Sequence, residues 1–271
     1  MLSSVLVEFS VFKIPAFAKP FPVICNNMRA LYILIFVIFT LNSCKKNEVK
    51  LQEIEFKNFK DWWTYYTKEI KLSKDFIALN SKNNEISKKQ FFDSLNTGEY
   101  LPIKLKKENE TYFLQKNKTN DVSIISTIKQ VAETQLFNLS WEGKKFPKFN
   151  FTDLSGNNYT SENTKSKILF LKTYYINCQA CNEEMPQLNK FIAENRDPNF
   201  IYLSLALDDE KKLKNYLANK NYEYQFVPDQ KEFIENKLQT NIFPTHFVIE
   251  NGIVKKVVNE SSELIDFAKN K

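Results

Sequence analysis

Apolar stretches of strand length recur in the second half of the chain, and segments of helical period separate them. The stretch KILFLKTYY, which begins at Lys167, is nearly continuously apolar, as expected for a strand buried on both faces. A helical segment begins after this strand, at the cysteine pair Cys178 and Cys181, and runs to about Asn195. A second apolar stretch, FIYLSLAL, follows it. Strands that alternate with helices predict an α/β sheet with a covering layer on each face.

The remainder of residues 146–271 continues this alternation. The further elements expected there are a hairpin turning at Ser155-Gly156-Asn157, helices over 209–220, 230–238 and 261–269, a strand near Tyr224–Val227, and a hairpin around Asn251-Gly252. Asn-Gly between two apolar runs is a strong two-residue turn signal. The pattern therefore predicts one ordered α/β domain over residues 146–271.

Residues 56–140 show a weaker, mixed pattern that predicts a small α+β region. One apolar helical face is expected from residues spaced three and four apart, namely Phe56, Phe59, Trp63, Tyr66 and Ile70. Residues 99–115 alternate and predict a hairpin that breaks at 107–110. A second amphipathic helix over 122–137 has Asn120 or Asp121 as its expected cap. The aromatic cluster DWWTYY is interpreted as core, with a ligand-stacking platform as the alternative, and the sequence assigns this region no role.

The N-terminal part of the chain has the pattern of a targeting sequence for export. Arg29 precedes an apolar run from Ala30 to Phe39, which is too short to span a bilayer core of about 30 Å but suits a signal peptide. The junction Leu41-Asn42-Ser43-Cys44 resembles a bacterial lipobox, in which the cysteine carries the lipid. A plain signal peptide or a short anchor is the alternative. We predict an upstream, mis-assigned start over 1–27, a lipoprotein signal peptide over 28–43, and a linker over 44–55.

Composition and charge narrow the function classes. A net charge of +6 is spread through the chain without a basic stripe, which argues against nucleic-acid binding. Of the four cysteines, Cys25 precedes the predicted start and Cys44 is the predicted lipid site. Cys178 and Cys181 then remain as a close pair in an extracytoplasmic protein, which points towards redox chemistry.

The Cys-x-x-Cys pair lies where the buried strand meets a helix. The first sulfur would sit at the helix N-terminus, where free N–H groups and the helix dipole favour an anion. Cys178 is thus predicted to be the attacking thiolate and Cys181 the resolving thiol. The chain has one histidine, His246, so a four-ligand structural metal site is excluded; no metal or other cofactor is predicted.

Three segments carry a resemblance to a known family. They are FPKFNFTDLSGNNYT, CQACNEEMPQLNKF with its kink proline Pro186, and NIFPTHFVIENG. In this order they resemble the TlpA/ResA-like membrane-anchored thiol–disulfide oxidoreductases of bacteria. The resemblance implies a thioredoxin-like fold with an N-terminal β-hairpin extension over 146–271, and it does not extend into 45–145.

The resemblance also implies roles for individual residues. Pro244 would be a cis proline opposite the disulfide, and Phe243 before it would offer its backbone to an extended partner chain. Glu184 would assist proton movement during exchange, with a solvated first-turn glutamate as the alternative. The position before the first cysteine, usually aromatic in the family and part of partner recognition, is Asn177 here.

Further departures from the family pattern concern the redox pair. Gln179-Ala180 lacks the proline that is common between the cysteines of relatives. Lys172 stands in the buried strand where relatives tend to have Asp or Asn. Our hypothesis is that Lys172 pairs with Glu184 and helps to hold Cys178 as a thiolate. The alternative is that this lysine extends to solvent.

The sequence thus favours an enzyme, a lipid-anchored thiol–disulfide oxidoreductase on the periplasmic side of a bacterial cell envelope. Its expected partners are protein thiols and disulfides, with a membrane-bound electron donor, and family analogy favours the reductive direction. One alternative is a copper-binding assembly chaperone that uses Cys178, Cys181 and His246. Another is a non-catalytic scaffold acting through residues 45–145. A peroxidase is disfavoured because its threonine-and-cysteine pattern is absent.

Overall fold

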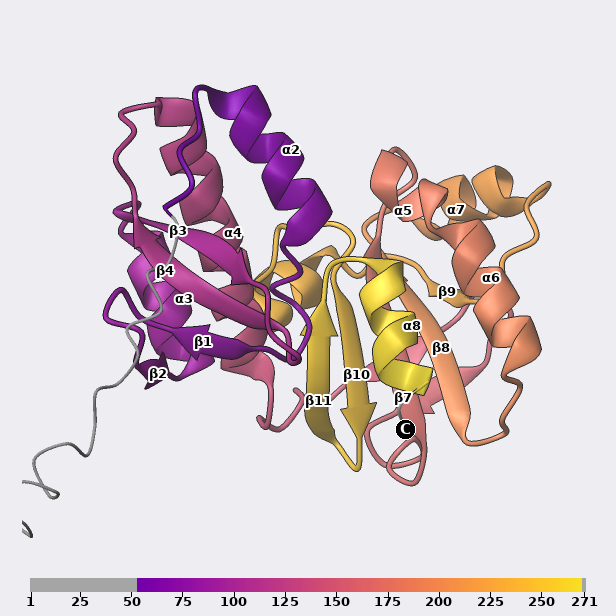
Figure 1. Ribbon diagram of the computed structural model, residues 1–271. Coiled ribbons are helices and arrows are strands. Elements are labelled where there is room, and N and C mark those ends of the chain that lie inside the picture. The colour runs from indigo at the N-terminus through magenta and orange to yellow at the C-terminus, as the bar shows by residue number, and fades with distance from the viewer. Residues whose placement is uncertain (1–52, 270–271) are drawn as a thin grey trace, which may run out of the picture. The chain divides into compact units, whose positions relative to one another are not determined.

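Figure 1 shows the computed structural model of the chain, which describes residues 53–269. The predicted upstream start 1–27, the signal peptide 28–43 and Cys44 lie outside the described residues. The described residues 53–269 belong to one compact unit. Within the described part, no helix has both the length and the apolar character needed to cross a membrane.

A five-stranded sheet forms the centre of the C-terminal part, in the order β11-β10-β7-β8-β9. Its strands are β7 (Ile168–Tyr174), β8 (Phe200–Ala206), β9 (Gln225–Val227), β10 (His246–Glu250) and β11 (Ile253–Val258). β7, β8 and β9 are parallel, whereas β10 runs antiparallel to both β7 and β11. The strand KILFLKTYY therefore lies in the middle of the sheet, with partners on both sides.

Each face of this sheet carries its own apolar layer. On one face, Phe170 and Tyr174 of β7 pack with Leu188 of α6 (Met185–Glu194) and Leu264 of α8 (Ser261–Lys269). On the other face, residues of the opposite parity such as Leu171 pack with a cluster that includes Phe146, Phe151, Ile234 and Leu238. In Figure 1, α6 and α8 lie along one side of the strands. The two covering layers expected from the alternation of strands and helices are present.

The helix after the cysteine pair is divided into two. α5 spans Gln179–Glu183 and α6 begins at Met185, with Glu184 at the junction. Pro186 lies in the first turn of α6 and has no N–H to continue the hydrogen bonds of α5. The sequence predicted one helix to about Asn195, so the break at Glu184 is a correction.

The remaining predicted elements of this part are found with small shifts. The first hairpin is β5 (Asn150–Thr152) with β6 (Asn158–Thr160), and α7 spans Glu210–Leu217 after its cap Asp209. The helix expected over 230–238 is instead a π-helix, η1 (Phe233–Leu238). The β10–β11 turn has positive φ at both Asn251 (54°) and Gly252 (73°), as a two-residue hairpin turn requires.

The N-terminal part of the described chain contains a four-stranded sheet in the order β2-β1-β4-β3. Its elements are α2 (Phe59–Glu69), β1 (Ile77–Leu79), β2 (Glu85–Ile86), α3 (Lys88–Asn96), β3 (Tyr100–Leu105), β4 (Thr111–Lys116) and α4 (Val122–Trp141). The β3–β4 hairpin and the Asp121 cap of α4 were predicted. β1, β2 and α3 were not, and Trp62 rather than Trp63 is buried, with Trp63 42% exposed.

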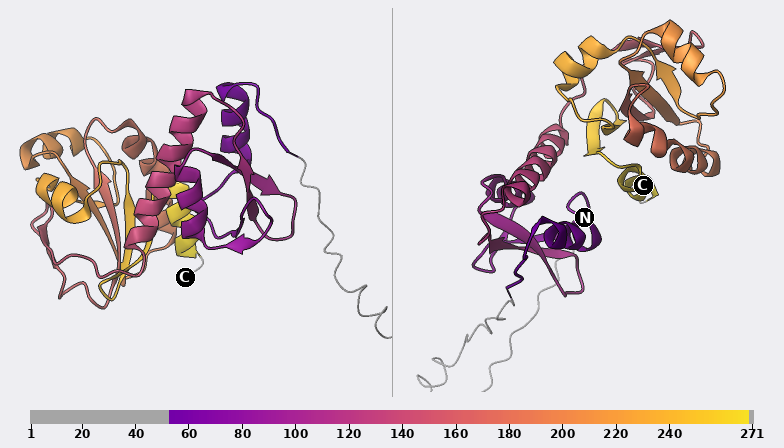
Figure 2. Two further views of the ribbon diagram at one scale, coloured as in Figure 1. Left: turned by 90° about the vertical axis from the view of Figure 1, so that its left-hand side faces the viewer. Right: turned by 90° about the horizontal axis from the view of Figure 1, so that it is seen from above.

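The long helix α4 belongs to two apolar cores. Ile124, Ile128 and Ala132 pack in the core of the first sheet. Farther along, Phe137 and Trp141 pack against the core that covers one face of the five-stranded sheet. Figure 2 shows α4 as one continuous helix.

Candidate functional site

The two cysteines of the Cys-x-x-Cys pair form a disulfide at the start of α5. Cys178 is the N-cap residue, and the N–H of Cys181 donates to Cys178 Sγ at 3.1 Å. Cys178 is 3% exposed and Cys181 is fully buried. The backbone at a helix N-terminus thus contacts the first sulfur directly, and this is the environment that favours a thiolate.

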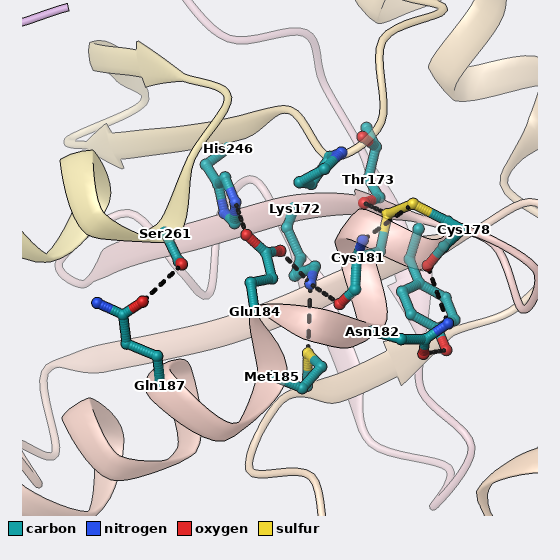
Figure 3. Close-up of polar contacts among 12 residues, drawn as sticks. Lys172, Thr173, Cys178, Cys181, Asn182, Glu184, Met185, Gln187, His246 and Ser261 are labelled. Atoms are coloured by element: carbon teal, nitrogen blue, oxygen red, sulfur yellow. Dashed lines mark hydrogen bonds and ion pairs between the residues drawn. A yellow bond between two sulfur atoms is a disulfide. The ribbon is translucent and has the colours of Figure 1, made fainter. Parts of the chain in front are cut away.

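Asn182 holds the turn that precedes the disulfide, as Figure 3 shows. Its side-chain N–H groups donate to the main-chain oxygens of Ile176 and Cys178, both at 2.9 Å. Its side-chain oxygen accepts from the hydroxyls of Tyr174 at 2.8 Å and Tyr216 at 3.1 Å. The turn is therefore anchored to the helix, the central strand and α7 through one amide.

A buried charge cluster lies beside the cysteine pair. Lys172 Nζ is 2.5 Å from Glu184 Oε1, and His246 Nε2 is 3.0 Å from Glu184 Oε2. Lys172 Nζ also donates to the main-chain oxygen of Cys181 at 3.3 Å and lies 3.3 Å from Met185 Sδ. Lys172 and His246 are fully buried. Lys172 thus points inward to Glu184, and the arrangement in which it extends to solvent does not occur.

The environment shifts the ionisation of this cluster. Burial acts to raise the pKa of Glu184, but His246 and then Lys172 outweigh it, so the pKa stays below its ordinary value. Burial lowers the pKa of Lys172, and Glu184 opposes that shift. A carboxylate can only accept, so His246 Nε2 carries the proton in this contact.

His246 is not arranged with the cysteines as a metal site. Its Nε2 is directed at Glu184, as Figure 3 shows. Within the described residues no group of three or more His, Cys, Asp or Glu side chains could hold a metal ion. The copper-binding alternative, which needs Cys178, Cys181 and His246 together, therefore has no geometric support here.

The Phe243–Pro244 peptide bond is cis, in the segment that leads into β10. The next residue, Thr245, is bonded to Thr173 at the end of the central strand. Its N–H donates to the side-chain oxygen Thr173 Oγ1 at 2.9 Å, and its main-chain oxygen accepts from the Thr173 N–H at 3.0 Å. The ring of Phe243 contacts that of Tyr175 with centroids 5.2 Å apart. The segment is thus fastened beside the turn that leads to Cys178.

The residues around the first cysteine are open to solvent. Asn177, Gln179 and Ala180 are exposed, Phe243 is half-buried and Pro244 is buried. A partner that approaches the disulfide would meet the exposed side chains first.

Sequence reasoning missed two features of the site. The sequence assigned Asn182 no function, because a polar residue in the first turn of a helix is common. His246 was weighed as a core residue or a copper ligand, because nothing in the sequence gives its register against Lys172. In the sheet these two residues are direct neighbours on β10 and β7.

Comparisons with known proteins concern the C-terminal part of the chain. Residues 143–257 match the AhpC/TSA family. The thiol-disulfide oxidoreductase ResA of Bacillus cereus is 26% identical over 124 residues, which are 45% of this chain and 72% of that protein. ResA of Geobacillus kaustophilus is 25% identical over 118 residues, which are 43% of this chain and 68% of that protein.

Solved structures also resemble a part of this chain. The thioredoxin domain of a thiol-disulfide oxidoreductase from Bacteroides vulgatus covers 48% of this chain and 96% of its own, at 20% identity and a TM-score of 0.43. The exposed lipoprotein thioredoxin of Streptococcus pneumoniae covers 46% of this chain and 100% of its own, at 18% identity and a TM-score of 0.41.

Proposed function

We propose that the chain, whose residues 143–257 form a thioredoxin-like thiol–disulfide oxidoreductase domain, reduces disulfides of proteins outside the cytoplasm. The observation that carries this proposal is the Cys178–Cys181 disulfide at the N-terminus of α5. The reductive direction is taken from the resemblance to the family, because a potential does not follow from the fold alone.

The proposed reaction has two exchange steps. The Cys178 thiolate attacks a sulfur of the substrate disulfide, which forms a mixed disulfide and releases one substrate thiolate. Cys181 then attacks Cys178 Sγ, so that the Cys178–Cys181 bond forms and the bond to the substrate sulfur breaks. Two electrons pass from the dithiol to the substrate, and both substrate sulfurs leave as thiols once they are protonated. Glu184 belongs to this catalytic set in our proposal, and an external dithiol must return the couple to its reduced form.

The partner chain is proposed to bind along the exposed side of the site. Asn177 precedes the attacking cysteine and is open to solvent, and Phe243 and Pro244 form the segment beside the turn. The backbone of Phe243 would pair with an extended substrate strand, as peptide-binding sites commonly use main-chain hydrogen bonds for affinity. Phe243→Pro, which removes the backbone N–H that such pairing uses, is expected to raise KM for a protein disulfide more than for a small disulfide.

We further propose that lipid on Cys44 anchors the protein to a membrane of the bacterial envelope. A signal peptide over 28–43 would direct export, and a membrane-bound protein would return electrons to the couple. Expression of the full chain and of Cys44→Ser, followed by fractionation, tests the anchor: the variant should leave the membrane fraction. Retention of the variant in that fraction would contradict the lipid anchor and leave the redox proposal intact.

Trapping of the substrate tests the reaction itself. Cys181→Ala should accumulate mixed disulfides through Cys178, because the second exchange step cannot occur. Cys178→Ala is the matched control and should trap none. The equilibrium of the couple with glutathione gives its direction: a reductase should lie towards the thioredoxin end of the range from about −270 to −120 mV. Absence of trapped partners together with a potential at the oxidising end would sink the proposal.

A further inference from the structure

Three ionisable side chains lie buried together beneath the disulfide. Lys172 and His246 are direct cross-strand neighbours on β7 and β10, and Ser204 of β8 is the neighbour of Lys172 on its other side. Glu184 reaches this row from the break between α5 and α6. Lys172, Ser204 and His246 are fully buried, and Glu184 is 8% exposed.

Both oxygens of Glu184 are occupied. Oε1 accepts from Lys172 at 2.5 Å and Oε2 accepts from His246 at 3.0 Å. Two donors on one carboxylate favour its charged form. Glu184 in this chain is therefore held as a carboxylate that orients Lys172.

Lys172 is in turn directed at the resolving cysteine. Its Nζ donates to the main-chain oxygen of Cys181, and Figure 3 shows the ammonium between Glu184 and Cys181. The Cys181 sulfur lies near the end of β7, 4.0 Å from the main-chain oxygen of Thr173. Cys178 Sγ instead contacts a backbone N–H at the start of α5. Of the two cysteines, Cys181 thus contacts the buried ammonium through its main-chain oxygen, and Cys178 contacts a backbone N–H through its sulfur.

We infer that Lys172, oriented through Glu184 by His246, is a positioning residue that stabilises the thiolate of Cys181 rather than that of Cys178. The inference rests on the proposed function, because Cys181 needs a thiolate only for the second exchange step. Cys181 is fully buried, so a thiolate there is costly without a nearby opposite charge. The thiol proton of Cys181 ends on the released substrate sulfur, and the ammonium of Lys172 keeps its own proton throughout.

Other groups that face Lys172 are aromatic or neutral. Its Nζ lies 5.6 Å from the Tyr174 ring centroid and 5.7 Å from that of Tyr224. Burial raises the pKa of both phenols, so both stay neutral where the thiols titrate. Ser204 Oγ and the Tyr224 hydroxyl have no hydrogen-bond partner within the described part of the chain. The positive charge that acts on Cys181 is therefore that of Lys172, which is paired with one oxygen of Glu184 while His246 holds the other.

The test measures each thiol by itself through the ultraviolet absorbance of its thiolate. In a chain that carries Cys25→Ser and Cys44→Ser, a further Cys178→Ser leaves only Cys181, and a further Cys181→Ser leaves only Cys178. Lys172→Met should lower the thiolate fraction of Cys181 at a fixed pH about tenfold or more, since a nearby opposite charge lowers a pKa by about 1–3. It should lower that of Cys178 far less. Lys190→Met, which removes an exposed lysine of α6, is the matched control and should change neither.

Two further variants, Lys172→Gln and Lys172→Arg, separate the effect of charge from that of hydrogen bonding. They also keep the inference testable if Lys172→Met does not fold. Lys172→Gln keeps an amide that can donate to Glu184 and to the Cys181 oxygen, but it has no charge. It should still lower the Cys181 thiolate fraction, whereas Lys172→Arg should retain most of it. An unchanged Cys181 in folded Lys172→Gln, or an equal loss at Cys178, would overturn the inference. These titrations use no substrate, so their outcome is distinct from a failure to trap mixed disulfides.

Discussion

Lys172 and Glu184 form a pair whose stability depends on both members. Glu184→Leu would leave a buried ammonium without its counter-charge, a loss of about 3–5 kcal/mol in unfolding free energy. The double variant Lys172→Met/Glu184→Leu should recover most of that loss and retain a deficit of about 1–3 kcal/mol, because His246 Nε2 would lose its acceptor.

Denaturant unfolding of the oxidised protein measures this difference. Lys89→Met is the control, since Lys89 and Asp93 form an exposed pair with 73% and 47% of their side chains accessible. Such a pair contributes about 0–1 kcal/mol. A double variant as unstable as Glu184→Leu alone would contradict the expected coupling.

Glu184 also predicts an acid dependence of stability. Its folded-state pKa lies below the ordinary value of 4.5, so the unfolded state binds the proton more tightly. The carboxylate therefore contributes stability that is fully present above that value and is lost as the pH falls through the lowered folded pKa. Unfolding free energies measured across this acid window should fall more steeply for wild type than for Lys172→Met/Glu184→Leu. Equal slopes would show that Glu184 titrates normally.

At the scale of single elements, Asn182 fastens the active-site turn to α5. Asn182→Ala removes two donors to main-chain oxygens and the acceptor for three tyrosine hydroxyls. We expect a loss of about 1–3 kcal/mol in unfolding free energy, together with faster amide hydrogen exchange at residues 175–178. Asn215→Ala, at an exposed position of α7, is a control of the same residue type. Protection at 175–178 equal to wild type would contradict this role.

The N-cap of α4 is a second element-scale test. Asp121 accepts from the backbone N–H groups of Ser123 and Ile124. Asp121→Ala should cost about 0.5–2 kcal/mol, and Asp121→Asn, which keeps an acceptor, should cost little. Thermal unfolding of the two variants gives the comparison. An equal loss for both would show that charge, rather than capping, is the main contribution.

The sequence predicted those helices and strands whose signal lies within one short segment of the chain. Turn chemistry placed the hairpins at Gly156 and Asn251-Gly252, and apolar continuity placed the central strand. Trp63 was assigned to the buried face because spacing alone does not set the phase of a short helix. The Asn58 cap begins the helix at Phe59, and tertiary packing buries Trp62 instead.

At the scale of the whole molecule, the candidate site could be predicted only where its residues are close in sequence or follow a known motif. Cys178, Cys181 and Glu184 lie within one short segment. The neighbourhood of Lys172 and His246 instead depends on the order and register of β7 and β10, which join residues 74 positions apart. No local sequence pattern indicates which residues of two distant strands are paired. The contact between His246 and Glu184 could therefore be identified only from the structure.

The long helix α4 connects the N-terminal part of the unit to the segment that contains the cis proline. The side chain of Asn138, 2% exposed, donates to Asn259 Oδ1 at 2.9 Å. Asn259 in turn donates to the main-chain oxygen of Pro244 at 3.2 Å and to Thr245 Oγ1 at 3.1 Å. One helix of residues 53–141 thus supports the segment that enters β10 beside the disulfide.

Asn138→Ala should therefore affect that segment as well as stability. We expect a loss of about 1–3 kcal/mol in unfolding free energy, because the half-buried oxygen of Asn259 would lose its donor. Amide exchange at Thr245 and His246 should accelerate more than exchange in β8, which shares no hydrogen bond with Asn259. Glu133→Ala, at an exposed position of the same helix, should change neither quantity. A uniform acceleration over the whole sheet would mean that Asn138 contributes to global stability alone, and that α4 gives the redox site no specific support.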